Sequence, residues 1–76
     1  MSELNEYKYR TVSETGRVGN WYVARGVNVR KALEAEALNG VTEGMAPLCV
    51  EVHGHGRYWL SVELKRVATI KKHLRR

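Results

Sequence analysis

The sequence predicts a small α+β domain in which two β-hairpins, joined by one helix, form a mostly antiparallel sheet (β-β-α-β-β) with the helix on one face. Three observations predict this fold class. Apolar and polar residues alternate from Pro47 to Lys65, tyrosines alternate with charged residues after Glu6, and a helical apolar stripe follows Asn28. A sheet and a helix with one apolar face each bury those faces by packing as two layers. The strand order stays open.

The first hairpin is expected between Glu6 and Arg25. Alternating tyrosine and basic residues indicate a strand from Glu6 to Ser13, and residues 13–20 contain the glycines, serine and asparagine typical of a turn. A return strand is then expected over Trp21–Arg25. Two pairs compete for the buried face of that strand: Trp21 with Val23, and Tyr22 with Ala24.

A helix is expected over Val29–Asn39. Asn28 is a suitable N-cap, because its short side-chain oxygen accepts from the free backbone amides of the first turn. Gly40 is a typical C-terminal stop. Arg30 and Glu34 fall on the exposed side, where they are spaced to form a weak ion pair. The apolar stripe comprises Val29, Ala32, Leu33 and Ala37.

The second hairpin has one apolar and one polar face. Its apolar residues are Leu48, Val50 and Val52, followed by Tyr58, Leu60, Val62 and Leu64. If these share a face, Val52 lies opposite Tyr58. The connection is then the three-residue loop 54–56, whose glycines suit the positive φ angles of tight turns. The other face carries Trp59, with Glu51 opposite it.

The end of the chain has two interpretations. Val67, Ile70 and Leu74 are spaced as on one side of a helix, which predicts a short amphipathic basic helix. Alternatively, the preceding strand continues to about Ile70 and the remainder is loose. We expect the helix. The domain is then residues 1–64, and residues 65–76 form a basic C-terminal tail.

The net charge of +5 is concentrated in this tail. Six of the 13 Lys and Arg residues lie there without any acidic residue, whereas residues 1–64 hold the other seven together with all eight glutamates. Such a cluster attracts phosphate in one interpretation and only aids solubility in the other. The basic residues of the tail are Lys65, Arg66, Lys71, Lys72, Arg75 and Arg76.

Length and composition set further bounds. A chain of 76 residues forms one domain, and its single cysteine, Cys49, allows no intramolecular disulfide. Such cysteine usage suits a reducing compartment. No apolar run approaches the roughly 20 residues that span a membrane. We therefore expect a soluble protein of the cytoplasm.

The residues that suggest metal binding or catalysis are spread along one strand. Four candidates alternate there: Cys49, Glu51, His53 and His55. At about 3.3 Å per residue, Cys49 and His55 are roughly 20 Å apart. His53 and His55 with Glu51 or His73 would give fewer ligands than the four of a structural zinc site. Cys49 and His53, roughly 13 Å apart, are too distant to act as nucleophile and base. We expect no metal, no cofactor and no enzymatic activity.

The polar face of the second hairpin is the candidate binding surface. A tryptophan beside an arginine is common at protein–protein hot spots, and a tryptophan also stacks on bases. The expected partner-binding residues are Trp59, Arg57, Glu51, His53 and His55. In the alternative interpretation, the basic residues of the tail bind nucleic acid directly, together with this aromatic face.

In size and layout, with one short helix among strands and no catalytic set, the chain resembles the small host-takeover proteins of bacteriophages. These include anti-CRISPR proteins and transcription inhibitors. The resemblance implies a non-catalytic protein that docks on, and inhibits, a host nucleic-acid-handling protein or complex in the host cytoplasm. Many such inhibitors are acidic mimics of nucleic acid, and the basic tail departs from that pattern. The alternative is direct nucleic-acid binding. A homodimer is compatible with either function, and neither involves a membrane.

Overall fold

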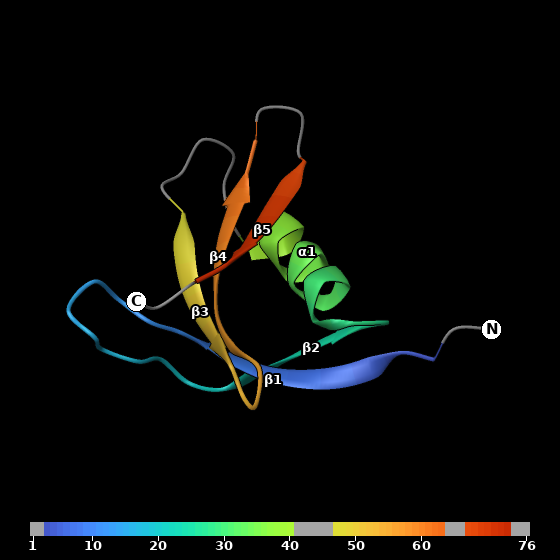
Figure 1. Cartoon of the computed structure of the whole chain (residues 1–76), viewed down its shortest axis with the longest axis horizontal. Helices are drawn as coiled ribbons and strands as arrows, with labels where there is room; N and C mark the ends of the chain where they lie inside the picture. Colours follow the sequence, from blue (N-terminus) through green and yellow to red (C-terminus); the bar gives the residue numbers. More distant parts are fainter. Residues whose placement is uncertain (1–2, 41–46, 64–66, 74–76) are drawn as a thin grey trace.

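Five antiparallel strands form one sheet that curls around a single helix as a half-barrel, which confirms the α+β class (Figure 1). The computed structural model describes residues 3–40, 47–63 and 67–73. Across the sheet the strand order is β2-β1-β3-β4-β5. Pairing of β1 with β3 therefore joins the two predicted hairpins. The elements along the chain are β1 (Asn5–Thr11), β2 (Tyr22–Gly26), α1 (Val29–Gly40), β3 (Leu48–Val52), β4 (Gly56–Val62) and β5 (Ala68–Lys72).

The register of β1 and β2 determines which side of β2 is buried. Tyr7 lies opposite Ala24, and Ala24 is fully buried. Because side chains alternate along a strand, Val23 points to the opposite side of the sheet, where it is exposed. Beyond the two strands, the hairpin continues as a bridge between Val12 and Val18.

The helix α1 begins and packs as the sequence predicts. The Oδ1 atom of Asn28 accepts a hydrogen bond from the backbone amide of Lys31 at 2.8 Å, which confirms the N-cap. The buried helical residues are Ala32, Leu33 and Ala37. The helix approaches β2 closely: a Cβ atom added to Gly26 would lie 2.5 Å from the backbone nitrogen of Ala32. Close packing against the helix therefore requires glycine at position 26.

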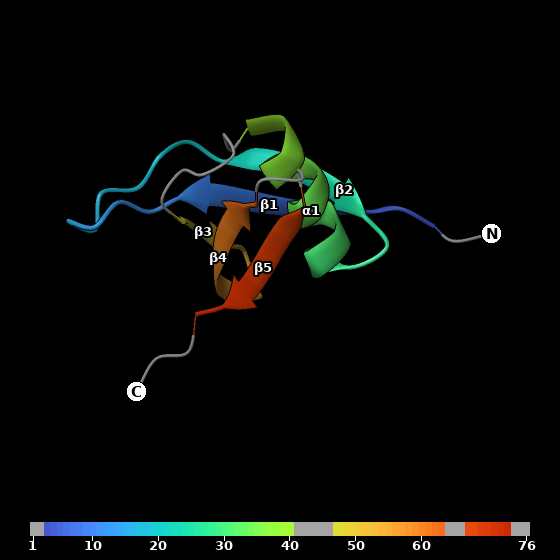
Figure 2. The same cartoon turned by 90° about the horizontal axis from the view of Figure 1, so that it is seen from above.

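Arg30 joins the helix to the far edge of the sheet. Its Nη1 atom donates to the carbonyl oxygen of Ile70 in β5 at 2.6 Å, whereas Glu34 lies 3.5 Å from the Nζ atom of Lys31. The predicted pairing of Arg30 with Glu34 is therefore wrong. A carbonyl on the edge strand offers the guanidinium a partly buried acceptor instead. The helix contacts β2, β4 and β5, and so covers the inner side of the half-barrel (Figure 2).

The β3–β4 hairpin keeps its predicted faces, but its register is shifted by two residues. Val52 lies opposite Gly56, not opposite Tyr58. The turn explains the shift, because the amide of His55 donates to the carbonyl of Val52 at 2.9 Å. At the third position of this turn Gly54 has a φ of 78°, and type II turns need a positive φ there. The loop is therefore residues 53–55.

The last described segment is a fifth strand, so the predicted basic helix is wrong. Ile70 lies opposite Leu60 of β4, and the amide of Glu63 donates to the carbonyl of Val67 at 2.9 Å. Ile70 is buried while Val67 is exposed. Pairing with β5 also gives partners to backbone groups of β4 that would otherwise form an open sheet edge. Leu74, the third residue of the predicted helical stripe, lies outside the described residues.

The core lies between α1 and the inner face of the sheet. Tyr9 of β1 ties these layers together, because its hydroxyl donates to the Oε1 atom of Glu36 at 2.6 Å. Burial, and then the hydrogen bond to this carboxylate, raise the pKa of the Tyr9 hydroxyl. The largest fully buried side chains are Leu33, Leu60, Val50 and Val52.

Within the described ranges, no helix has the length and apolar character needed to cross a membrane.

Candidate binding surface

The side of the sheet turned away from α1 carries the candidate residues, and we name it the outer face. Cross-strand pairing arranges its side chains in rows. Arg10 lies opposite Glu51, which in turn lies opposite Arg57. In the next row Lys8 is beside His53, whose amide donates to the carbonyl of Lys8 at 2.8 Å. The residues of this surface are Glu6, Lys8, Arg10, Trp21, Val23, Arg25, Cys49, Glu51, His53, Arg57, Trp59, Ser61, Glu63, Thr69, Lys71 and His73.

Trp21, which directly precedes β2, lies on the outer face with 42% of its surface exposed. The Cζ atom of Arg10 is 4.4 Å from the centroid of the indole ring. The ring of His53 meets the indole edge to face, with 5.8 Å between centroids. A guanidinium over an indole contributes about 0.5–1 kcal/mol at an exposed site. These contacts hold the indole in place and leave a large part of it accessible.

Trp59 of β4 is 37% exposed on the same face. It lies opposite Cys49 of β3 and opposite Lys71 of β5. The predicted pairing with Glu51 is wrong, since the hairpin register is shifted by two residues. The ring of His73 meets the indole edge to face, with 5.4 Å between centroids. Each tryptophan therefore has a histidine ring beside it.

An ion pair joins β1 to β3 between the two tryptophans. The Nε and Nη2 atoms of Arg10 each lie 2.7 Å from the Oε1 atom of Glu51, and both side chains are 29% exposed. Short, charge-assisted contacts between partly buried groups are stronger than those of an open surface pair. Because Glu51 neutralises Arg10 while Arg10 covers Trp21, this pair orients the indole.

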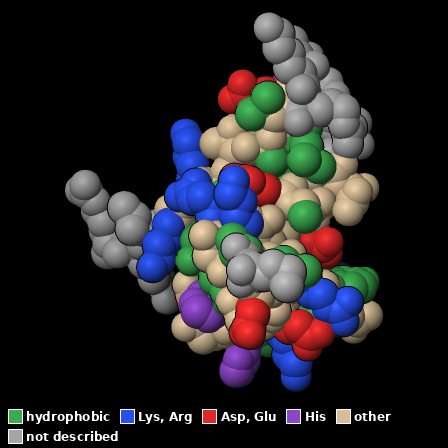
Figure 3. All heavy atoms as spheres, turned by 90° about the vertical axis from the view of Figure 1, so that its right-hand side faces the viewer, with side chains coloured by type: hydrophobic (Ala, Val, Ile, Leu, Met, Phe, Trp, Pro, Cys, Tyr) green, Lys and Arg blue, Asp and Glu red, His purple; other side chains and the backbone are tan. Residues whose placement is uncertain are grey.

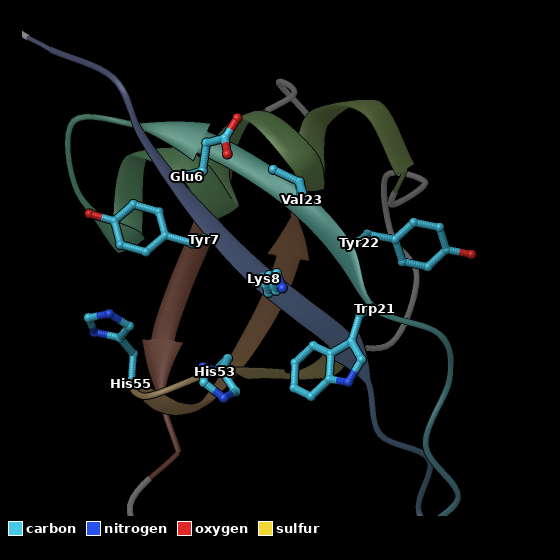
Figure 4. A pocket seen from close by; sticks show the side chains of 8 residues that line it. All are labelled: Glu6, Tyr7, Lys8, Trp21, Tyr22, Val23, His53 and His55. Carbon is cyan, nitrogen blue, oxygen red and sulfur yellow. The ribbon is translucent and has the colours of Figure 1, made fainter.

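Two hollows indent the outer face, and each contains one tryptophan. The hollow around Trp21 has a volume of about 580 Å³ and the one around Trp59 about 340 Å³. In Figure 4 the rings of the first hollow surround Lys8, which is seen end-on near the centre. The Trp21 hollow is lined by Glu6, Tyr7, Lys8, Trp21, Tyr22, Val23, His53 and His55. The Trp59 hollow is lined by Val12, Ser13, Glu14, Pro47, Leu48, Cys49, Arg57, Trp59 and His73.

Most acidic residues of the outer face already form an ion pair or a hydrogen bond within the chain. Glu51 pairs with Arg10, and Glu6 pairs with Arg25 at 2.8 Å. Glu63 accepts from the hydroxyl of Thr69 at the far end of β4. Figure 3 shows a different side of the molecule, the right-hand side of Figure 1 where α1 lies; there, basic side chains gather in one group and acidic and basic ones are mixed farther down. Three basic side chains of the outer face form no ion pair with any described residue: Lys8, Arg57 and Lys71.

Cys49 lies in the Trp59 hollow and is buried. Burial raises the pKa of its thiol, and the charge of nearby Arg57 offsets part of that effect. A raised pKa favours the protonated thiol, whereas a nucleophile or metal ligand needs the thiolate. Cys49 therefore has the surroundings of a packed side chain.

The structure brings most of the predicted partner-binding residues together. Glu51, His53, Arg57 and Trp59 lie on the outer face. His55 lies in the turn, where its ring is 5.4 Å from that of Tyr7, and it lines the Trp21 hollow. Among the tail residues, Lys71 is on the outer face and Lys72 is opposite Tyr58, on the inner side. Lys65, Arg66, Arg75 and Arg76 lie outside the described residues.

Sequence reasoning missed Trp21 and its partner Arg10. A usable signal was present in β2, where Ala24 and Gly26 are two residues apart. A helix packed close to a sheet needs small residues beneath it, and both of these are buried there. Because side chains alternate between the two faces of a strand, burial of Ala24 and Gly26 beneath the helix places Trp21 and Val23 on the outer face.

The candidate functional residues of the structure are those of the outer face, and they do not form a metal centre. Over the described ranges, no group of three or more His, Cys, Asp or Glu side chains is placed to hold a metal ion. His53 and His55 contact different rings, those of Trp21 and Tyr7. Comparison with protein-family models, curated proteins and solved structures gives no match.

Proposed function

We propose that this chain is a non-catalytic protein that binds nucleic acid through the outer face of its sheet. One observation carries the proposal: both tryptophans of the chain lie exposed on that face, among basic side chains that have no acidic partner in the described structure. Stacking of a base on an aromatic ring contributes about 1–3 kcal/mol. Lysine and arginine attract phosphates whatever the base sequence.

This proposal relocates the main contact from the tail to the sheet. The sequence-based alternative combined the basic residues of 65–76 with the aromatic face of the sheet. Of these basic residues, Lys71 belongs to β5 and lies opposite Trp59. Its ammonium group therefore extends the basic surface beside the indole. Phosphate attraction and base stacking then act at one place, as in other proteins that bind single strands on a positively charged, aromatic surface.

A second candidate function is docking on a host nucleic-acid-handling protein or complex, with inhibition as the result. It is favoured by the exposed apolar side chains of Trp21, Val23 and Trp59 and by the mixed charges around Glu51. Tryptophan and arginine are the residues most enriched at protein–protein hot spots. A partner protein with a complementary surface would use the same outer face.

Fluorescence anisotropy with a labelled single strand of about 12 nucleotides tests the first function. At physiological salt we expect dissociation constants between about 1 and 100 μM, the range of sequence-independent binding. Trp59→Ala should weaken binding about tenfold through lost stacking. Val27→Ala is a control, because Val27 is an exposed apolar residue in the connection between β2 and α1.

Failure of the natural chain to bind either single-stranded or duplex nucleic acid would reject the proposal. In that case, affinity capture from a bacterial lysate treated with nuclease tests the second function. One defined protein that is retained by the natural chain, and released by Trp59→Ala, would support docking on a protein.

A further inference from the structure

The two tryptophan hollows are separated by the width of two strands. Trp21 precedes β2 and Trp59 lies in β4, with β1 and β3 between them. Three strand spacings correspond to roughly 14 Å. Trp21 lies beside the row of Arg10, Glu51 and Arg57, whereas Trp59 lies two residues, or roughly 7 Å, farther along β4, so the two positions are roughly 16 Å apart. A ligand that fills both hollows must therefore present two flat groups about this far apart.

The row between the hollows constrains the charge of such a ligand. Arg10 and Glu51 neutralise each other there. Arg57 lies opposite Glu51 on the next strand but forms no ion pair with it or with any other described residue. Lys8 lines the first hollow and Lys71 lies opposite Trp59. Positive charge is thus available at both hollows and on the path that joins them.

A single-stranded nucleic acid has this combination of features. Its bases are free to stack on protein rings, and its phosphates carry the negative charge between them. In a duplex the bases are stacked on one another inside the helix, so that a flat indole on a sheet meets mainly phosphate and sugar. At the 3.4 Å spacing of stacked bases, roughly five to six nucleotides cover 16 Å, and fewer do so when the strand is extended.

We infer that a single strand of DNA or RNA crosses the outer face obliquely to the β-strands, with one base on Trp21 and another on Trp59. Lys8, Arg57 and Lys71 bind the phosphates along this path. Arg10 and Glu51 act as positioning residues, because the ion pair keeps the guanidinium against the indole of Trp21. This inference rests on the proposed function and adds the strandedness of the ligand, its direction and its two contact points.

The chain is suited to a direct test, because its only two tryptophans are the two proposed contacts. Trp21→Phe leaves Trp59 as the single indole fluorophore, and Trp59→Phe leaves Trp21. Titration with unlabelled oligothymidylates should quench both variants, since a stacked base quenches indole emission. A duplex of the same length should quench neither.

Length dependence then tests whether one strand reaches both hollows. Strands of about two nucleotides should bind weakly, and strands of about six or more, which exceed the span, should bind much more tightly. Trp21→Leu and Trp59→Leu should each lower the affinity for the longer strands at least fivefold, the equivalent of about 1 kcal/mol of stacking. The phenylalanine variants should retain most of the affinity, because phenylalanine still offers a ring. Circular dichroism and thermal melting of each variant verify that it is folded.

The outcomes separate this inference from the proposed function. Quenching of one tryptophan only, at every length, would overturn the two-point path while nucleic-acid binding stands. Equal binding of duplex and single strand without quenching would also overturn it, and would leave phosphate attraction as the mode of binding. Absence of binding to any strand would reject the proposed function and the inference with it.

Discussion

The hydroxyl of Tyr9 donates a 2.6 Å hydrogen bond to the Oε1 atom of Glu36, and so joins β1 to α1. Desolvation of Tyr9 and this hydrogen bond raise the pKa of the hydroxyl. The proton is therefore held more tightly in the folded chain than in the unfolded one. The stabilisation that results is fully present below the unfolded pKa of about 10, and is lost as the pH rises above it.

Tyr9→Phe should lower the free energy of unfolding by about 1.5 kcal/mol at neutral pH, the lower end for a hydrogen bond to a charged group. Above pH 10 the natural chain should lose stability more steeply than the variant, since the variant has no proton to release at this position. Urea denaturation at several pH values measures both effects. Glu36→Gln keeps an acceptor but removes the charge, so its free energy of unfolding at neutral pH should lie between those of the natural chain and Tyr9→Phe. The same pH dependence in the natural chain and Tyr9→Phe would contradict the prediction.

Arg30 makes a second connection, from α1 to the carbonyl of Ile70 on the edge strand β5. Arg30→Met keeps most of the apolar stem and removes the guanidinium, so it should cost about 1.5 kcal/mol, the lower end for a charged donor. The neighbouring substitution Lys31→Met is a matched control, because the Lys31–Glu34 pair lies on the helix surface and contributes about 0.3 kcal/mol. Equal costs for the two variants would show that the bond to β5 adds no stability.

Gly26 tests the close approach of α1 to β2. Its missing Cβ atom would lie 2.5 Å from the backbone nitrogen of Ala32, and backbone cannot rotate away as a side chain can. Gly26→Ala should therefore destabilise the fold by about 1–3 kcal/mol, as overpacking does. A Cβ atom on Gly40 at the end of the helix would meet nothing within 4 Å. Gly40→Ala should be neutral or slightly stabilising. Thermal melting of both variants measures the difference in stability between them. Equal stability of Gly26→Ala and the natural chain would contradict the prediction.

Elements with strong local signals were predictable from the sequence. The helix followed from Asn28, which caps it, and from the stripe that places Leu33 in the core. The faces of the second hairpin followed from the alternation of apolar residues. Its register did not, because a shift by two residues leaves every side chain on the same face. The turn at Gly54 determines the register. The sequence alone did not show where the turn lies, because Gly54 and Gly56 both suit a positive φ angle.

The C-terminal segment shows how tertiary contacts override local pattern. Val67, Ile70 and Leu74 have helical spacing, but Ala68 and Ile70 also alternate as in a strand. Two partners outside the segment decide the outcome. Leu60 lies opposite Ile70 in the sheet, and Arg30 binds the carbonyl of Ile70 from the helix. Neither contact is visible in a short stretch of sequence.

The candidate site was predictable only in part for the same reason. Trp59 and Arg57 share a strand, so their common face followed from spacing alone. Trp21 joins them only through the pairing of β1 with β3, which places Arg10 opposite Glu51. That pairing connects two hairpins far apart in the sequence, so no local pattern reveals it.

Salt dependence provides the last prediction, because it counts the phosphates that the outer face neutralises. Each phosphate contact on a single strand contributes about −0.7 to the slope of log K against log salt. Arg57→Gln combined with Lys71→Gln should therefore make the slope shallower by about 1.4, because the other basic residues of the tail are the same in both proteins.

The matched control is Arg17→Gln combined with Lys31→Gln, which removes the same charge from the loop after β1 and from α1. It should leave the slope nearly unchanged, since neither residue lies on the outer face. Anisotropy titrations of the three proteins over about 50 to 200 mM salt provide the measurement. If both double variants reduce the slope equally, the positive charge acts through the net charge of the molecule, and the outer face has no special role in binding phosphate.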